Sequence, residues 1–515
     1  MIEAPLHAAP RRTEQAWLPA LAGVAAAGLG LGVAELVAGL LSRTLTPVIA
    51  VGEAFIDRVP TWLKDLAVEW FGTADKTVLI GGVLVVFAAL SAGIGVLTAR
   101  HRGVGLSAAA ALGAVAALAV ASRPDSSAGD LLPTIVGAGV SLIALDRLAG
   151  RVPAAEVAPD AADGRRTFLR TVGIVGGLGL VAFYAGRWLG RRRSSVEESR
   201  DAVALPDQTV EEPPGVDLGV EDAEPWQTPN EVFYRIDTAL AVPLVQAETW
   251  GLRVHGLVER EVNLTFDELV DMGLVERWVT LTCVSNEVGG YLAGNALWAG
   301  VPVADVLAMA GPAADADAVK STSADGWTAG TPLDVLTDGR DALFAVAMNA
   351  EPLPVEHGFP VRMVVPGLYG YVSATKWVVD VEVTRFADFK AYWSTRGWSE
   401  RGPIKTASRI EVPRSGAGVS AGRVAVAGVA WAQHRGIQSV EVRVDNGQWQ
   451  RARLAEVPSA DTWRQWVWEW DAEPGDHDLQ VRATSADGDL QTEEEAPPAP
   501  DGATGWHQVT VTVDE

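Results

Sequence analysis

Residues 347–377 read AMNAEPLPVEHGFPVRMVVPGLYGYVSATKW, and this stretch is the most informative part of the sequence for the fold. Within it, His357 and Arg362 lie five residues apart in HGFPVR, and Lys376 closes SATKW. Taken alone, such a histidine is more often a structural residue, and the two cations are more often surface charges. A cationic binding pocket is the alternative, and the surrounding sequence decides between the two interpretations.

A second block, TLTCVSNEVGG at residues 280–290, contains Cys283, the only cysteine among the 515 residues. A single cysteine excludes an intramolecular disulfide and any zinc or iron–sulfur site built from cysteines alone. The run RWVTLTCV is rich in β-formers, so Cys283 is predicted at the end of a strand, where a side chain can project into a cavity. The thiol is therefore a packed core group, a nucleophile or a single soft metal ligand.

The charge of the chain is unevenly distributed. Residues 201–515 contain 22 Lys and Arg against 49 Asp and Glu, a net charge of −27, whereas residues 1–200 contain 19 against 16, a net charge of +3. A protein surface this acidic repels phosphate backbones, so nucleic acid is not expected as a partner. An apolar, mildly basic portion is thus followed by a strongly acidic one.

Five apolar segments in the first portion are each long enough to cross a bilayer, which takes roughly 17 to 25 residues. They lie near residues 17–41, 77–98, 104–121, 131–148 and 172–189. We therefore predict an α-helical membrane bundle of about five helices over residues 1–193, in contact with membrane lipid. None of the seven histidines lies inside these segments, so paired axial ligands for a membrane haem are not expected.

Basic residues between the segments predict their orientation. Arginines before the first segment, between the second and third, and between the fourth and fifth are expected on the cytoplasmic side, which places the chain after the fifth segment outside. The segment GRRTFLRTVGIVGGLGLVAFYAG resembles a twin-arginine export signal, with Arg165 and Arg166 preceding a Gly-rich helix. Paired arginines are also typical of an ordinary cytoplasmic anchor. A twin-arginine signal would imply a domain exported already folded, often around a cofactor.

After the apolar segments, the chain continues with two regions of different composition, residues 194–229 and residues 230–410. Residues 194–229 are rich in Glu, Asp, Pro and Ser and are predicted to be an exposed acidic linker. Residues 230–410 mix strands with helices. WGLRVHGLV indicates a strand, and LTFDELVDMG indicates a helix that begins after Thr265. This mixture is typical of an α+β domain.

Residues 411–515 show short alternating runs such as GRVAVAGVAW, SVEVRVDNGQW and WHQVTVTV, which predict a β-sandwich. Asn446 and Gly447 are predicted to form a tight hairpin turn between two strands. Tryptophans recur at positions 463, 466, 468 and 470. They mark either an association surface or aromatic packing inside the sandwich.

From about residue 230 onward, the sequence resembles the sulfite oxidase family of molybdopterin enzymes, in the bacterial branch that includes the catalytic subunit of periplasmic methionine sulfoxide reductase. Four blocks carry the resemblance in the family's order: NEVFYRIDTALAVP, TLTCVSNEVGG, the stretch 347–377 and GPIKTASRIEVP. The resemblance implies a sulfite-oxidase-type molybdopterin-binding domain and then an immunoglobulin-like dimerisation domain. A homodimer is therefore a possible assembly.

The resemblance also implies roles for individual residues. Cys283 would be the protein ligand of molybdenum, because a metal held by a pterin dithiolene accepts one further soft thiolate. Arg235 would line both the cofactor site and the substrate pocket, where a guanidinium suits an oxyanion. A surface ion pair is the alternative for Arg235, and a turn-forming serine is the alternative for Ser323. The implied cofactor contacts are Tyr234, Arg235, Ser323, His357, Arg362, Ala374, Thr375 and Lys376.

The implied reaction is the transfer of an oxygen atom between molybdenum and a small substrate. No CxxCH or GxGxxG motif is present, so no haem or flavin is predicted and the electrons need a separate carrier. Two departures leave the substrate open. Glu287 follows Asn286 where sulfite oxidases usually have arginine, and Trp327 takes the place of a pocket tyrosine.

The sequence leaves three alternative functions open. An acidic group near the metal would disfavour dianions, so a sulfoxide reductase stands beside a sulfite-type oxidase. A non-catalytic adhesion or scaffold module on a membrane anchor is the third. The thiol together with His357, Arg362 and Lys376 argues against the third, since a scaffold has no use for a cofactor pocket.

Overall fold

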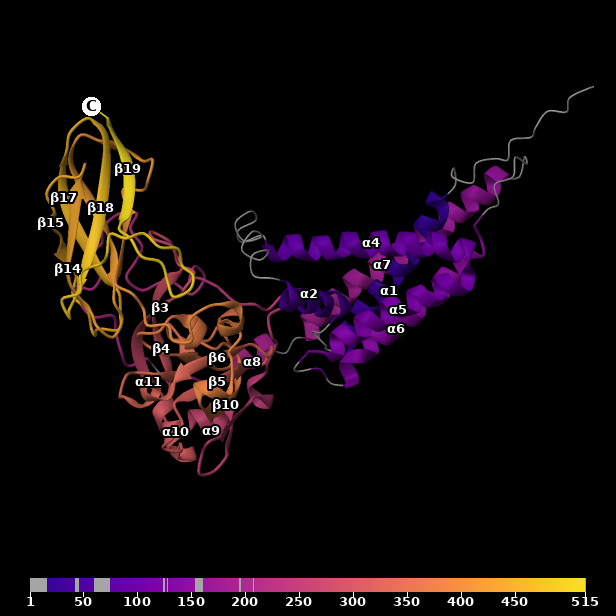
Figure 1. Cartoon of the computed structure of the whole chain (residues 1–515), viewed down its shortest axis with the longest axis horizontal. Helices are drawn as coiled ribbons and strands as arrows, with labels where there is room; N and C mark the ends of the chain where they lie inside the picture. The colour runs from indigo at the N-terminus through magenta and orange to yellow at the C-terminus, as the bar shows by residue number, and fades with distance from the viewer. Residues whose placement is uncertain are drawn as a thin grey trace, which may run out of the picture. The chain divides into compact units, whose positions relative to one another are not determined.

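The structure is a computed structural model that describes residues 16–41, 46–59, 75–123, 126, 128–152, 161–193, 196–206 and 208–514. The chain divides into two compact units, shown in Figure 1. The first unit comprises residues 1–195 with residues 239–242, and the second comprises residues 196–238 and 243–515.

The first unit is helical. Among its described residues, five helices are long and apolar enough to cross a membrane, and the five predicted apolar segments coincide with them, the first extending one residue past its helix. The last helix begins well before the predicted segment and includes Arg165 and Arg166. The elements of this unit are α1 (Trp17–Leu40), α2 (Pro47–Arg58), α4 (Asp75–Arg100), α5 (Arg102–Ala121), η2 (Ala128–Asp130), α6 (Leu131–Ala149) and α7 (Ala161–Arg193).

Glycines let α1 pack closely against its neighbours α4, α6 and α7. A Cβ atom added to Gly32 would lie 2.0 Å from the carbonyl oxygen of Gly179 in α7. One added to Gly39 would lie 2.1 Å from the carbonyl oxygen of Gly186. Small residues at a helix crossing allow the two backbones to approach. The glycine content of the apolar segments therefore has a packing role along α1.

Two mixed or antiparallel sheets form the first half of the second unit. One has the strand order β2-β1-β10-β5-β6, and the other has the order β3-β4-β7-β8, with β9 paired to β7. Their strands are β1 (Gly251–Gly256), β2 (Val262–Thr265), β3 (Val275–Thr282), β4 (Ala293–Pro302), β5 (Ala318–Ser323), β6 (Thr328–Pro332), β7 (Leu343–Met348), β8 (Glu351–Pro352), β9 (Arg362–Val364) and β10 (Val378–Thr384).

Short helices connect these strands, so the prediction of mixed α and β structure is confirmed. The predicted helix after Thr265 is α9, and the Thr265 hydroxyl accepts from the backbone N–H of Glu268 in a capping box. The helices and turns are α8 (Val196–Ala202), α9 (Phe266–Val270), α10 (Val303–Ala310), α11 (Leu333–Thr337), η3 (Ala247–Thr249), η4 (Val355–His357), η5 (Gly370–Val372), η6 (Phe386–Asp388) and η7 (Ser394–Arg396).

Two further sheets form the second half of this unit, with strand orders β11-β13-β17-β16 and β12-β19-β18-β14-β15. They share one apolar core, to which both sheets contribute, as the predicted sandwich requires. Figure 1 labels β14, β15, β18 and β19 of the second of these sheets and β17 of the first. The strands are β11 (Ala407–Val412), β12 (Gly418–Ser420), β13 (Gly422–Trp431), β14 (Ile437–Val444), β15 (Gln450–Arg451), β16 (Arg453–Leu454), β17 (Arg464–Ala472), β18 (Gly475–Ser485) and β19 (His507–Asp514).

Three of the four tryptophans in and just before β17 are buried, and the fourth, Trp468, is partly buried against the same core. Trp463 and Trp466 are fully buried, and Trp470 is nearly so. Trp466 and Trp470 belong to the shared core of the two sheets. The association-surface interpretation was therefore wrong for these three residues, and internal aromatic packing is the correct one.

Two details of the sandwich differ from the prediction. β11 pairs with β13, so the predicted boundary at residue 410 cuts through a strand that belongs to the sandwich. The hairpin turn is also one residue earlier than predicted, because Asp445 and Asn446 have φ values of 50° and 58° and Gly447 N donates to Val444 O. Both central residues of this turn type need positive φ, which Asp and Asn tolerate.

The segment predicted as an exposed linker, residues 194–229, packs on the second unit where the structure describes it. Trp226 is fully buried, and the indole N–H groups of Trp226 and Trp463 each donate to the other's backbone carbonyl oxygen, at 3.3 and 2.9 Å. Arg200 in α8 donates to the carbonyl oxygen of Pro352 at 2.9 Å. The exposed-linker prediction was wrong here because a few apolar anchors bind a segment whose overall composition is acidic. We call this segment the strap.

Candidate active site

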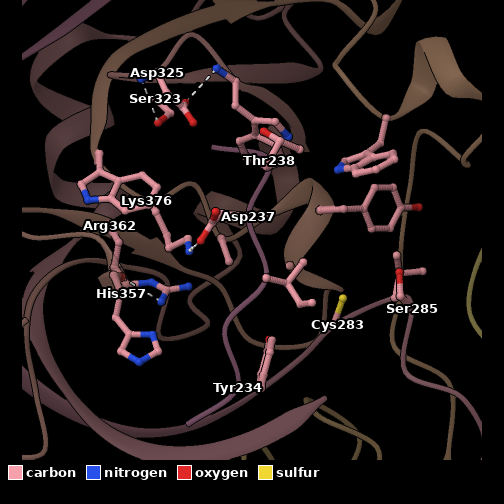
Figure 2. A pocket seen from close by; sticks show the side chains of 18 of the residues that line it. Tyr234, Asp237, Thr238, Cys283, Ser285, Ser323, Asp325, His357, Arg362 and Lys376 are labelled. Atoms are coloured by element: carbon pink, nitrogen blue, oxygen red, sulfur yellow. Dashed lines mark hydrogen bonds and ion pairs between the residues drawn. The ribbon is translucent and has the colours of Figure 1, made fainter. Parts of the chain in front are cut away.

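A pocket in the second unit opens beside Cys283 and encloses about 910 Å³, its open mouth included. Its walls come from the chain after the strap, the end of β3, the turn after β5, and the stretch around residues 357–377. Figure 2 shows Cys283 and Ser285 on one side of this pocket and His357, Arg362 and Lys376 on the other. Three of the four sequence blocks, far apart along the chain, thus contribute walls of one cavity, and the fourth, residues 402–413, is not in the lining.

Cys283 lies immediately after β3, as predicted, and its side chain lines the pocket although the residue is largely buried. Its backbone N–H donates to Leu292 O at 2.8 Å, which anchors the strand end. Burial raises the pKa of the thiol, while hydrogen bonds from the backbone and side chain of Ser285 oppose this rise. The sulfur therefore sits in a site that protects it from water and still supplies donors to a thiolate.

His357 and Arg362 are brought together by the turn HGFPVR. The Arg362 guanidinium donates from Nη1 to His357 O at 3.0 Å and lies 5.0 Å from the ring centroid of Trp298. Gly358 has φ 116°, and a Cβ at this position would lie 2.9 Å from the Arg362 Cβ, so only glycine fits. Burial lowers the pKa of Arg362 to about 10. Burial is also the main reason that the pKa of His357 falls to about 3, with Arg362 and Lys376 adding to the effect.

Lys376 is almost fully buried and forms an ion pair with Asp237, with Nζ 2.7 Å from Oδ2. It also donates to Glu356 O at 3.1 Å. Burial lowers the pKa of Lys376 to about 8, and the charge of Asp237 partly offsets that change. The pocket therefore contains a lysine whose charge changes within an accessible pH range.

Of the other predicted cofactor contacts, some line the pocket and others do not. Tyr234, Ser323 and Ala374 line the pocket. Thr375 is buried and is not among the lining residues, and its hydroxyl lies 2.7 Å from Ser321 Oγ. Ser323 also forms the predicted turn, because its carbonyl oxygen accepts from Gly326 N at 2.8 Å. Ser323 thus forms the turn and also lines the pocket, while its contact with a cofactor stays a prediction.

Arg235 does not line the pocket, contrary to the prediction. Its side chain is 41% exposed, and Nε pairs with Asp237 Oδ2 at 2.9 Å. The structure therefore shows the ion pair of the alternative interpretation, and a contact of Arg235 with cofactor or substrate stays a prediction. The adjacent Tyr234, in contrast, lines the cavity.

Of the two residues that depart from the sulfite oxidase pattern, Trp327 lines the pocket and Glu287 does not. Trp327 lines the pocket, as expected. Glu287 is exposed and is absent from the lining, so the argument that it places an anion beside the metal was wrong. Asn286, in contrast, is buried and accepts from Leu292 N at 2.7 Å through Oδ1. The loop turns after Asn286 in a way that carries Glu287 to the surface.

Sequence reasoning missed an aromatic wall of the pocket. Trp393 and Trp398 line it, with ring centroids 6.0 Å apart, and Tyr371 lies 5.9 Å from Trp398. Trp393 and Trp398 lie between the third and fourth blocks, in AYWSTRGWSE, where the sequence has no motif. The richness of this run in Trp and Tyr was the available signal. Asp237 and Asp325 were also missed, although both lie inside or beside residues already singled out.

The arrangement combines three chemical features. One soft sulfur ligand projects into the cavity, two buried cations and a neutral imidazole form its far end, and aromatic rings form another wall. Such a set suits an elongated ligand with a metal at one end and an anionic group at the other.

Comparisons with known proteins agree with this chemistry. Residues 239–393 match the family model described as "Oxidoreductase molybdopterin binding domain". Human mitochondrial sulfite oxidase is 30% identical over 314 residues, which cover 51% of this chain and 56% of that protein. The oxidoreductase YuiH of Bacillus subtilis is 34% identical over 153 residues, which cover 30% of this chain and 74% of that protein.

A solved structure also aligns with the chain. The sulfane dehydrogenase SoxCD from Paracoccus pantotrophus has a TM-score of 0.49 and 22% sequence identity, covering 61% of this chain and 90% of that one. The chain spans little more than half the length of the mammalian sulfite oxidases that it matches.

Proposed function

Because the chain belongs to the sulfite oxidase family of molybdopterin oxidoreductases, we propose that it transfers an oxygen atom to or from a small substrate at the pocket beside Cys283. The family membership makes the chain an enzyme with a molybdenum–molybdopterin cofactor. A separate electron carrier completes the proposed cycle, since two electrons must enter or leave for each oxygen atom moved.

One observation carries the proposal: the only cysteine of the sequence lies in the same pocket as His357, Arg362 and Lys376. These residues come from segments about 75 to 95 positions apart, and a protein core would normally exclude two such cations. A non-catalytic module has no reason to bury them around a cavity. The scaffold alternative is therefore not supported.

The residues of the pocket fit the cofactor. Its Cys283 end offers the one protein thiolate that a molybdenum dithiolene accepts, and its other end offers donors and positive charge for the pterin phosphate. We assign Cys283 as metal ligand and His357, Arg362, Lys376, Tyr234 and Ser323 as residues that hold the cofactor. When bound, the cofactor supplies the two-electron change and the exchangeable oxygen.

The protein side chains supply position and environment. Ser285 donates to the Cys283 sulfur and thereby favours the thiolate needed for metal binding. The neutral imidazole of His357 can donate or accept a hydrogen bond without adding charge beside Arg362. The aromatic wall made by Trp393, Trp398 and Tyr371 limits the access of water to the reacting atoms.

The five long apolar helices support an anchoring role for the first unit. We propose that they span the cell membrane and that the second unit faces the extracytoplasmic side, following export through the Arg165–Arg166 signal. The sandwich is proposed to be immunoglobulin-like and to carry a homodimer contact, as the family resemblance implies. These assignments make the protein a membrane-anchored, externally facing enzyme.

Metal analysis of the purified full-length chain tests the proposal. After expression in a host that makes molybdopterin, about one molybdenum per chain is expected for the wild type, and Cys283→Ser should lose turnover because the oxygen ligand replaces a soft thiolate. A wild-type protein without molybdenum would reject the assignment. A Cys283→Ser variant with normal activity would reject the cysteine as metal ligand.

A second candidate, sulfoxide reduction, is favoured by the composition of the pocket walls. The two lining cations, Arg362 and Lys376, are engaged with a backbone carbonyl and with Asp237. The lining also includes Trp327, Trp393 and Trp398. Aromatic surface attracts apolar substituents far more than it attracts a hydrated dianion. We therefore favour an uncharged substrate with an organic substituent over sulfite.

The two candidates separate in a kinetic comparison. Methyl phenyl sulfoxide with a reduced viologen dye and sulfite with ferricyanide are the paired assays. Trp393→Ala should raise KM for the sulfoxide about tenfold, because an aromatic contact worth about 1 kcal/mol and buried area are lost together. Trp449→Ala, in the sandwich and outside the pocket lining, is the control. Efficient sulfite oxidation with no sulfoxide turnover would favour the oxidase instead.

A further inference from the structure

The strand that ends at Cys283 lies at the edge of its sheet. In the order β3-β4-β7-β8, β3 pairs only with β4 among the described strands. The other edge of a strand carries backbone N–H and C=O groups that need partners when they are buried. These partners determine how firmly the end of β3, and with it the cysteine, is held.

Loops of the sandwich supply those partners. Thr280 N donates to Asp461 O at 2.9 Å, and the Gln433 amide donates from Nε2 to Thr280 O at 3.3 Å. Asp461 and Gln433 follow the sandwich strands β16 and β13, respectively. The C-terminal sheets therefore complete an edge of the catalytic sheet without adding a strand to it.

Side chains reinforce the same contact one residue from the thiol. Gln433 Nε2 also donates to Thr282 Oγ1 at 2.8 Å, and Thr282 directly precedes Cys283. Trp463 N donates to Thr280 Oγ1 at 2.7 Å. Thr280, Thr282 and Gln433 are all at most 2% exposed. Hydrogen bonds in so dry an environment hold their partners strongly, because the alternative is an unsatisfied buried group.

The loop after the cysteine is held from the sandwich as well. Arg409 in β11 is fully buried and donates from Nη1 to Gly290 O at 2.7 Å. Its guanidinium lies 4.5 Å from the ring centroid of Tyr291. The His507 ring of β19 packs on Gly289, where an added Cβ would lie 2.2 Å from the ring. The sandwich thus contacts the chain both before and after Cys283.

We propose that the sandwich positions Cys283, with Gln433 and Arg409 as the positioning residues that hold the strand end and the loop. The role in metal binding rests on the proposed function of Cys283, whereas the restraint on the thiol itself does not. This gives the C-terminal sheets a function in the active site that is separate from any contact between two copies of the chain.

The apoprotein provides a test that does not need the cofactor. The full-length chain, purified in detergent from a host unable to make molybdopterin, is alkylated with iodoacetamide, and mass spectrometry follows Cys283. Gln433→Met removes both amide donors and keeps a similar side-chain volume. It should raise the alkylation rate about tenfold, because opening of the strand end becomes easier. Amide hydrogen exchange over residues 278–290 should accelerate in parallel.

Two further variants keep this test decisive. Gln508→Met makes the same change on an exposed site of β19, where the side chain accepts from Gln480, and should leave both rates within about twofold of wild type. Thr282→Val removes the acceptor from the other side, and the double variant with Gln433→Met should add little to either single change. Wild-type alkylation and exchange in Gln433→Met would overturn the proposal.

The loaded enzyme gives the complementary readout. If Gln433 orients the ligand, Gln433→Met should keep its molybdenum but shift the electron paramagnetic resonance spectrum of the one-electron-reduced metal, with Gln508→Met unchanged. An unshifted spectrum together with normal alkylation would assign Gln433 a purely structural role. A wild-type chain without molybdenum would reject the proposed function, while the alkylation result would still decide whether the sandwich restrains the thiol.

Discussion

At the residue scale, the site depends on charged groups that would be unstable in a core without partners. Lys376 and Arg362 are both nearly fully buried, and each is held by a specific acceptor, Asp237 for the lysine and His357 O for the arginine. Burial lowers the pKa of each of the two cations. Binding of an anionic group would offset the free-energy cost of burying these two cations, since it adds an opposite charge beside them.

The shifted pKa of Lys376 predicts a pH dependence of cofactor uptake. The lysine is charged below about pH 8 and neutral above it in the apoprotein. Uptake of molybdopterin by the apoprotein should therefore weaken as pH rises, by up to about tenfold for each pH unit above the pKa, because one proton is linked to binding. Reconstitution titrated from pH 6 to pH 10 measures this.

A matched pair of variants isolates the lysine. Lys376→Met should bind the cofactor weakly at all pH values and lose the alkaline decline. Lys390→Met removes a 62% exposed lysine and should retain the wild-type profile. An alkaline decline that persists in Lys376→Met would assign the titration to another group.

At the element scale, two kinds of close contact define the fold. In the second unit, hydrogen bonds from sandwich loops cover the free edge of β3. In the first unit, glycines allow α1 to approach α7 and α6. A Cβ on Gly30 would lie 2.6 Å from Gly137 O in α6, so the helices are also in close contact there, though less close than at Gly32. In both units the contact involves backbone atoms, which cannot move aside as a side chain can.

The α1–α7 crossing predicts a strong position effect of glycine substitutions. Gly32→Val should destabilise the helical unit by about 1–3 kcal/mol, since overpacking forces the two backbones apart. Gly28→Val is the control in the same helix, because nothing lies within 4 Å of a Cβ added there. Thermal unfolding in detergent, followed by circular dichroism, should show a lower midpoint for Gly32→Val alone. Equal midpoints for the two variants would contradict the packing described.

At the scale of the whole molecule, the chain joins a helical unit and a catalytic unit with different surface properties. The helices of the first unit expose large apolar side chains such as Leu118 and Val181, as surfaces in contact with lipid do. The second unit carries the acidic surplus of the sequence. The proposed membrane-anchored enzyme would account for both properties in one chain.

The export hypothesis predicts an outcome for the arginine pair. Changing Arg165 and Arg166 together to Lys keeps the charge but removes the pair that a twin-arginine signal needs, so the second unit should remain inside the cell. Protease added to spheroplasts should then fail to cleave it. Arg147 and Arg151 changed together to Lys form the control and should leave cleavage intact. Unchanged cleavage in the Arg165, Arg166 variant would point to another export route.

Much of the fold could be predicted because its signals are local. The apolar length of the five segments, the capping residue Thr265 and the alternation in residues 422–431 each depend on neighbours in sequence. Membership of the sulfite oxidase family could be recognised from four blocks and is confirmed by the comparisons. The position of Cys283 at a strand end was likewise visible in the β-rich run before it.

The sequence by itself determined which groups are available: one thiol, a histidine and two cations in a recognisable stretch, and five apolar segments. The tertiary structure alone decided which of them meet. It directs Arg235 and Glu287 away from the pocket, brings Trp393 and Trp398 into it, and closes the edge of β3 with Gln433. The reason is physical, because side-chain direction and the partners of a free strand edge depend on long-range packing, to which residues distant in the sequence contribute.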